Sequence, residues 1–220
     1  MNDAIISVKG LGEISLKPDV IVIKMHVIAI NLDYAKMNSD AAISISHLKQ
    51  CFSGIGFNKK CLKTINFRIT SEYERIKNTS SEWEDRFIGY KCQHDLVLEF
   101  EYDINKLEEV INAISESGVK PKYDIKFSVK NQKQIKKKLI NSAVNDAKNK
   151  AQIIASAAGV KLGDIVNINY SEEVLNLFSP TTYDNSLRGA RLMSEASIDI
   201  NPQEIQARDY IIIQWAIINS

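Results

Sequence analysis

Three histidines are the side chains of this sequence best suited to acid–base chemistry, and they lie far apart. They are His26, His47 and His94. His94 falls on the apolar side of an alternating strand pattern, where a hydrogen-bonded core histidine is more common than a catalytic base. His26 shares a face with Lys24, which predicts an exposed position or an interface. The spacing fits neither a catalytic triad nor a zinc site, so we predict no catalytic residue and no metal.

Two groups of charged residues could also take part in chemistry. Paired carboxylates can serve acid–base catalysis, and five acidic residues surround a polar turn: Glu72, Glu74, Glu82, Glu84 and Asp85. Basic residues are interspersed among them, which is typical of a solvated hairpin loop. Further along, Arg188 and Arg191 could bind a phosphate or a carboxylate from a long polar segment.

Gly10 and Gly12 stand inside an apolar N-terminal strand pattern that turns at Pro18 and Asp19. The pair is not a phosphate loop, because the third glycine is missing and a strand follows where a helix N-terminus would be required. Glycine inside a strand marks a bulge or the close approach of another backbone, and here a bulge is favoured. We predict no cofactor.

Hydrophobic periodicity predicts an α+β fold with mostly antiparallel sheet covered by three main helices. Apolar residues at steps of three and four predict the helices at 33–53, 104–117 and 132–158. The third has an apolar face of alanines that favours tight packing; Asn131 and Gln134 have capping-box spacing at its start, and Gly159 ends it. Alternation predicts strands at 5–16, 20–29, 65–73, 87–102, 123–129, 165–170, 196–200 and 205–218.

Two segments are predicted as loops. Residues 78–85 are polar and suit a hairpin loop between strands. Residues 172–195 have no clear period, and a loop of this length in a compact domain is usually functional, flexible or an assembly arm. The last two strands would form a hairpin with its turn at Asn201 and Pro202.

Length and composition are those of an ordinary globular protein, expected to be one two-lobed domain over residues 1–220. The chain has 45% hydrophobic and 25% charged residues and a net charge of +1. No apolar run reaches the about 18 residues that a membrane helix needs, so no transmembrane segment is expected. The start lacks the features of a secretory leader. We therefore expect a cytoplasmic protein as the sequence stands, or a periplasmic or cell-envelope protein if a leader was removed.

The three cysteines leave two interpretations open. Cys51, Cys61 and Cys92 are an odd number, which disfavours a complete disulfide framework. Buried, inert thiols are the more common outcome. A bridge between Cys51 and Cys61 in an oxidising compartment is the alternative.

Charge is strongly segregated along the chain. Residues 71–116 carry twelve acidic and five basic side chains, whereas residues 117–163 carry eleven lysines and two aspartates. The blocks could be solvated and paired within one chain, or they could meet between subunits in a head-to-tail interface that closes a ring. In the second case Lys133, Lys136 and Lys137, together with Arg188 and Arg191, are candidate interface residues. Aromatic residues for stacking are missing from the lysine stretch, so no nucleic-acid partner is predicted.

Three stretches together resemble one family. The first contains Val8, Gly10, Gly12, Glu13, Pro18 and Asp19; the second is the end of an alanine-spaced helix with Gly159 and Gly163; the third is residues 201–208 followed by an apolar strand. In this order they are similar to the SIMPL-domain family, which includes bacterial envelope and periplasmic immunogenic proteins and a eukaryotic kinase-associated signalling protein. Asn201, Pro202 and Gln203 stand where a Pro-Gly-type turn is expected.

The resemblance implies a SIMPL-like fold and supplies no catalytic residues to transfer. It also implies a homo-oligomer, ring- or channel-like in the envelope members, with a link to the cell envelope or oxidative stress. We therefore expect a non-enzymatic structural or interaction protein. The alternative is a small-molecule-binding protein or an enzyme with a pocket near Arg188, Arg191 or His94.

Overall fold

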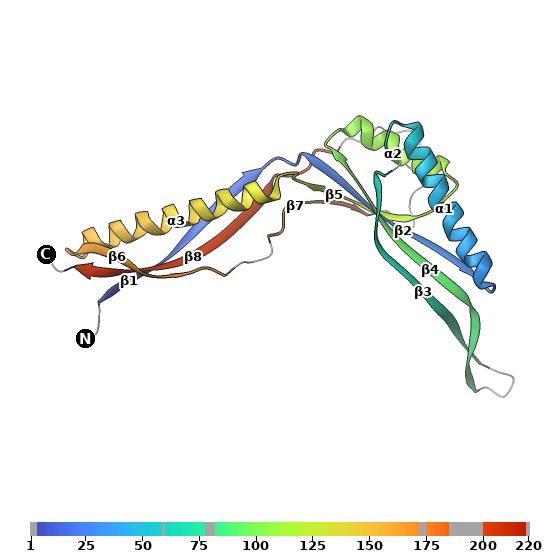
Figure 1. Cartoon of the computed structure of the whole chain (residues 1–220), viewed down its shortest axis with the longest axis horizontal. Helices are drawn as coiled ribbons and strands as arrows, with labels where there is room; N and C mark the ends of the chain where they lie inside the picture. The colour runs from blue at the N-terminus through green and yellow to red at the C-terminus, as the bar shows by residue number, and fades with distance from the viewer. Residues whose placement is uncertain (1–3, 59, 78–81, 172–174, 185–199, 219–220) are drawn as a thin grey trace. The chain divides into compact units, whose positions relative to one another are not determined.

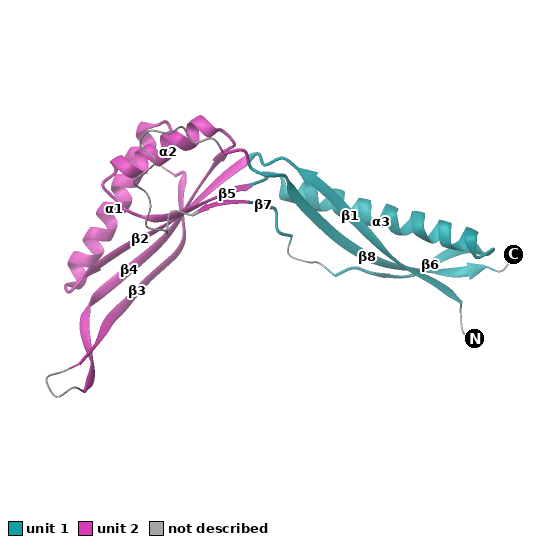
Figure 2. Ribbon diagram, turned by 180° about the vertical axis from the view of Figure 1, so that it is seen from behind, with its two compact units in different colours: residues 1–19, 128–180, 202–220 teal, residues 20–127, 181–201 magenta. Residues whose placement is uncertain are grey.

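The computed structural model describes residues 4–58, 60–77, 82–171, 175–184 and 200–218 (Figure 1). This part of the chain contains three helices and eight strands arranged in two sheets, as the α+β prediction requires. The chain divides into two compact units (Figure 2). The first comprises residues 1–19, 128–180 and 202–220, and the second comprises residues 20–127 and 181–201.

The first unit is a three-stranded antiparallel sheet with one long helix on it. Strand β8 (Ile205–Ile218) lies between β1 (Ile5–Leu16) and β6 (Lys161–Asn169). Helix α3 (Gln132–Ala157) runs along this sheet (Figure 1). A row of buried alanines on α3, at every fourth position, packs on the apolar faces of β1 and β8: Ala143, Ala147, Ala151 and Ala155.

Gly10 and Gly12 allow the backbone of α3 to approach β1. A Cβ atom on Gly10 would lie 2.0 Å from the carbonyl oxygen of Ala143, and one on Gly12 would lie 2.1 Å from the carbonyl oxygen of Leu139. The predicted bulge is wrong, because the register between β1 and β8 runs along the whole of β1 without a shift. The glycines instead permit the close backbone approach that the alanine face of α3 suggested.

The ends of α3 match the prediction in part. Gly159 follows the helix with φ +70°, the left-handed stop expected there. Asn131 precedes the first turn. Its Nδ2 donates a hydrogen bond to the side-chain oxygen of Gln134 at 3.0 Å, but its side-chain oxygen accepts none from the backbone N–H groups of the first turn, so the capping box is incomplete. At the predicted turn, Asp19 Oδ1 accepts the backbone N–H of Lys130 at 2.8 Å, which ties the turn to the start of the α3 segment.

The second unit is built on a five-stranded sheet. Its strands, in spatial order, are β3 (Leu62–Lys77), β4 (Trp83–Glu101), β2 (Val20–Asn31), β5 (Lys122–Ser128) and β7 (Phe178–Asp184). Helices α1 (Tyr34–Gly54) and α2 (Ile104–Glu116) cover one face (Figure 2). Buried side chains of both helices pack on β2 and β4 to form the largest core of the molecule.

Two predicted loops contain strand in the described part of the chain. Strand β4 begins at Trp83, so residues 83–85 of the first predicted loop belong to a strand, and residues 78–81 lie outside the described residues. Strand β7 occupies 178–184 within the segment predicted as a loop; residues 172–174 and 185–199 of this region lie outside the description. The sequence did not predict β7 because the segment is short, does not alternate and contains Pro180. Proline is tolerated there because β7 is an edge strand. The strand predicted at 196–200 also falls almost entirely outside the described residues.

Strands β3 and β4 continue as a pair beyond the end of β2. The last residue of β2 pairs with Tyr90, whereas β3 and β4 remain paired to the Lys77–Trp83 position. We call this two-stranded part, residues 71–77 and 83–90, the distal hairpin (Figure 1). Tyr73 and Trp83 are exposed on it. A hairpin without a third strand is marginally stable alone, so the distal hairpin depends on the sheet at its base.

Candidate functional site

His94 lines a hollow between α1 and the strands β3 and β4. The hollow has a volume of about 370 Å³. It is lined by Asn38, Ala41, Ala42, Ile45, Ser46 and Lys49 of α1 together with Phe67 and His94. Nε2 of His94 lies 2.7 Å from the Thr64 hydroxyl, and the His94 and Phe67 rings meet edge to face with centroids 5.2 Å apart. Two neighbours on β3 therefore hold the imidazole in place.

Burial lowers the pKa of His94, and the positive charge of Lys49 lowers it further, against a smaller opposite effect of Asp95. The imidazole is therefore neutral near physiological pH. A neutral imidazole bonded to a hydroxyl is part of a nucleophile–base arrangement. The adjacent carboxylate does not complete it, because Asp95 points to the opposite face of the sheet and bonds His26 there. The histidine is hydrogen-bonded as predicted, but it is half-buried beside the hollow instead of enclosed in the core.

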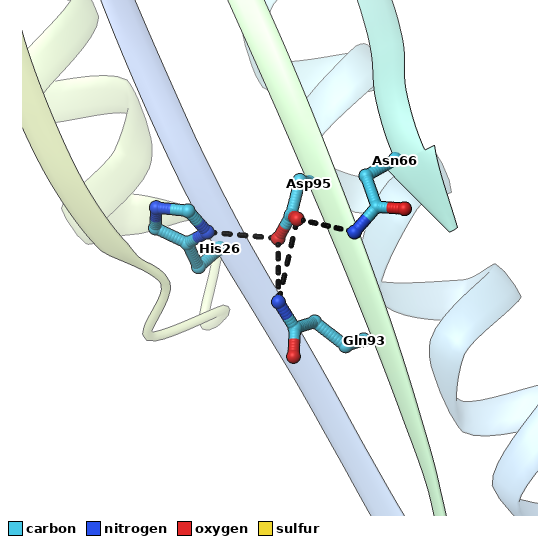
Figure 3. A network of polar contacts seen from close by, with 4 residues as sticks. All are labelled: His26, Asn66, Gln93 and Asp95. Carbon is cyan, nitrogen blue, oxygen red and sulfur yellow. Dashed lines mark hydrogen bonds and ion pairs between the residues drawn. The ribbon is translucent and has the colours of Figure 1, made fainter. Parts of the chain in front are cut away.

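A polar network occupies the other face of this sheet (Figure 3). The Asp95 carboxylate lies 2.8 Å from Nδ1 of His26 and accepts hydrogen bonds from the amides of Asn66 at 2.9 Å and Gln93 at 3.1 Å. Strand register explains the cluster, since His26 and Asn66 are the cross-strand partners of Asp95 on either side of β4. His26 was predicted to be exposed or at an interface. Its side chain is 41% exposed and is bonded to a buried carboxylate, and the interface alternative stays a prediction.

The network keeps Asp95 ionised. Burial by itself would raise the pKa of Asp95, but the hydrogen bonds from Asn66, His26 and Gln93 outweigh it and bring the pKa below its usual value. A buried carboxylate with several donors is a stable structural element of a sheet. The network was missed in the sequence because it requires the register of three strands, which the sequence pattern leaves open.

The three cysteines are free thiols in the structure. Burial raises the pKa of both Cys61 and Cys92. A raised pKa reduces the thiolate fraction and with it reactivity. Cys92 is buried, as the interpretation of buried, inert thiols requires, whereas Cys51 and Cys61 are half-buried. The free thiols give no support to a bridge between Cys51 and Cys61.

The candidate interface residues are only partly described. Lys133 and Lys137 are exposed on α3 and Lys136 is half-buried, whereas Arg188 and Arg191 lie outside the described residues. The suggested role of these five side chains in an interface stays a prediction. Gly163 lies in β6, where a Cβ atom would approach the carbonyl oxygen of Ala216 to 3.0 Å, so its role is one of packing.

Among the described residues, no group of three or more histidine, cysteine, aspartate or glutamate side chains could hold a metal ion. Among the helices described, none is both long and apolar enough to cross a membrane.

Comparison with known proteins decides the family. The SIMPL model, described as a protein of unknown function (DUF541), matches residues 6–215. The chain belongs to the SIMPL family. A search among curated proteins found no match.

The SIMPL match spans both sheets and all three helices, from β1 to β8. The three stretches on which the resemblance rested lie within it. Gly10 and Gly12 of the first stretch meet α3, and the second stretch contains the end of α3 with Gly159. For this SIMPL protein the shared residues therefore explain the fold, and any function has to be argued from its own surfaces.

Proposed function

We propose that this SIMPL protein is a non-enzymatic building block of a homo-oligomer. The observation that carries the proposal is the apolar edge strand β6. Ile165, Val166 and Ile168 are 52%, 58% and 55% exposed on this strand. In the described part of the chain β6 pairs on one side only, with β8.

An edge strand of this composition favours association with another chain. Soluble proteins usually protect their sheet edges with charges, prolines or a covering segment, because free backbone groups pair with other strands. Exposed Ile153 and Ile154 on α3 add apolar surface in the same unit. A second copy that buries β6 would remove this surface from water, at roughly 25 cal/mol for each Å² of apolar area.

The charge distribution supports the same proposal. The acidic block at 71–116 belongs to the second unit, and most of the basic block at 117–163 belongs to the first. Exposed Lys133 and Lys137 of one copy could therefore meet the acidic surface of another. A head-to-tail contact between two unlike surfaces is repeated from one copy to the next. It forms a ring when the rotation that relates successive copies returns to the first copy. A role of such an assembly in the cell envelope or in oxidative stress is an expectation from the family resemblance.

Light scattering of the purified protein over a range of concentration and salt tests the proposal. A mass of several chains that persists at high salt would support an apolar contact through β6, and a mass that falls with salt would support the charged contact. A mass of one chain at low salt and high concentration would contradict the proposal.

A second candidate function has its own supporting observation. The hollow lined by His94 suits a small-molecule-binding protein better than it suits an enzyme, since the carboxylate next to His94 is engaged on the other face.

A further inference from the structure

We propose that the hollow beside His94 binds a small organic anion with an apolar body, such as a medium-chain carboxylate. The site would belong to each single chain and does not depend on self-association. Its elements are an apolar floor, one ammonium group and a fixed imidazole.

The space exists because α1 turns small side chains toward β3. Ala41, Ala42 and Ser46 line the hollow at steps of one and four along the helix. The strand on the other side supplies Phe67, a residue that is 52% exposed even though its ring packs on His94. The volume of about 370 Å³ is at the lower end of the roughly 300–1,000 Å³ usual for small-molecule sites. A chain of several methylene groups would cover Phe67 and the alanines.

Lys49 sets the charge of the ligand. Lys49 belongs to the lining, and among the described residues no carboxylate lies within ion-pair distance of its ammonium group. Besides burial, this positive charge contributes to the lowered pKa of His94, and it makes a small contribution against the rise that burial causes in the pKa of Cys61. An anionic group would compensate this charge, whereas a cation would be repelled.

The polar lining can fix the anionic group. Asn38 and Ser46 carry side-chain donors on the helix side of the hollow. His94 is held by Thr64 and Phe67, so it offers a flat, immobile wall that costs little side-chain entropy on binding. Charge-assisted hydrogen bonds from Lys49 and these donors would orient a carboxylate, while the alkyl body lies on the apolar floor.

Titration of the protein with sodium octanoate, followed in an amide nitrogen–proton correlation spectrum, tests the proposal. Saturable shifts should appear for the amides of Ala41, Ala42 and Ser46. Lys49→Gln should weaken octanoate binding about fivefold, whereas Lys36→Gln, an exposed lysine of the same helix outside the lining, should leave it unchanged. Octanamide, which lacks the charge, should bind the parent and Lys49→Gln equally weakly.

A second pair of variants fills the site. Ala42→Trp should abolish the octanoate shifts, and Ile43→Trp, at an exposed position outside the lining, should retain them. The spectra themselves report whether each variant is folded. The proposal is overturned if the shifts do not saturate, if they map to β6, if the two lysine variants behave alike, or if folded Ala42→Trp still binds octanoate. None of these measurements depends on molecular mass. A protein that is monomeric but binds octanoate would therefore contradict the proposed self-association and still support the octanoate site.

Discussion

The backbone N–H of Leu11 donates a hydrogen bond to the Asp146 carboxylate at 2.7 Å, which joins the edge strand β1 to α3. Nζ of Lys150 donates to the same oxygen at 2.6 Å. Because β1 is an edge strand of its sheet, a backbone group that could pair with another chain is occupied from within. The opposite edge, β6, presents apolar side chains instead. The two edges of one sheet thus differ, and the proposed self-association would use β6.

We expect Asp146→Asn to lower the free energy of unfolding by about 1 kcal/mol near neutral pH, since a charged acceptor is lost. The hydrogen bonds from Lys150 and Leu11 bring the pKa of Asp146 below its usual value. A lowered native pKa stabilises the protein above the unfolded pKa, and the contribution is lost as the pH falls through the native pKa. The parent should therefore lose stability below about pH 4, and the variant should lose less. Urea unfolding at several pH values measures both effects.

The control is Asp164→Asn, at an exposed position on β6. If both variants show the same change with pH, the bond between Leu11 and Asp146 makes no specific contribution to stability.

The contact between β1 and α3 gives a second prediction. Gly12→Ala should destabilise the protein by about 3 kcal/mol, because the new methyl group would overlap the Leu139 carbonyl and push the helix from the strand. Gly54→Ala at the end of α1 is the matched control, since a Cβ atom there meets nothing within 4 Å. Its effect should be near zero or slightly stabilising. Chemical unfolding of the two variants distinguishes a close approach from a general effect of removing glycine.

The sequence predicted the elements whose signal is local. The three helices were placed nearly to the residue because their buried stripes, such as Met37, Ala41 and Ile45 in α1, follow the helical period. The alanine face of α3 predicted that another element packs closely on the helix. It did not identify Gly10 and Gly12 of β1 as the residues opposite the alanines. That contact joins residues far apart in the chain, and a glycine pair has the same local pattern in a bulge as in a close approach.

Features that depend on strand register could not be predicted. His94 was correctly assigned to a hydrogen bond, but its partner Thr64 and the hollow beside it arise from the pairing of β3 with β4. The cluster around Asp95 likewise needs two neighbouring strands in the right register. Strand β7 was missed because Pro180 and its short length remove the alternating pattern.

The network in Figure 3 is expected to stabilise the sheet. Asp95→Ala should lower the free energy of unfolding by about 2 kcal/mol, because three side-chain donors lose a buried charged acceptor. Asp85→Ala on the distal hairpin, where the aspartate is exposed, should lower the free energy of unfolding by less than about 0.5 kcal/mol. Thermal or urea unfolding of both variants measures the difference, and equal effects would show that the network does not stabilise the fold.

The environments of the cysteines predict an order of reactivity. Cys92 is fully buried and its pKa is raised by burial, so it should react with iodoacetamide only when the protein unfolds. Cys61 is partly accessible but also has a raised pKa, so its reaction should be slower than that of a cysteine in an unfolded peptide at the same pH. Mass spectrometry of labelled peptides over time gives each rate. Rapid labelling of Cys92 in the native protein would contradict the buried position.

The proposed interface through β6 makes the last prediction. Ile168→Asp places a charge in the apolar edge and should raise the dissociation constant of the oligomer at least about tenfold, since an isoleucine side chain buried in each copy contributes about 1.5–3 kcal/mol. Ile28→Asp makes the same change at a similarly exposed isoleucine of β2 in the other unit. Sedimentation or light scattering against concentration should show dissociation for the first variant alone. If Ile28→Asp dissociates the oligomer and Ile168→Asp does not, the contact lies on the five-stranded sheet, and the apolar residues of β6 have another role.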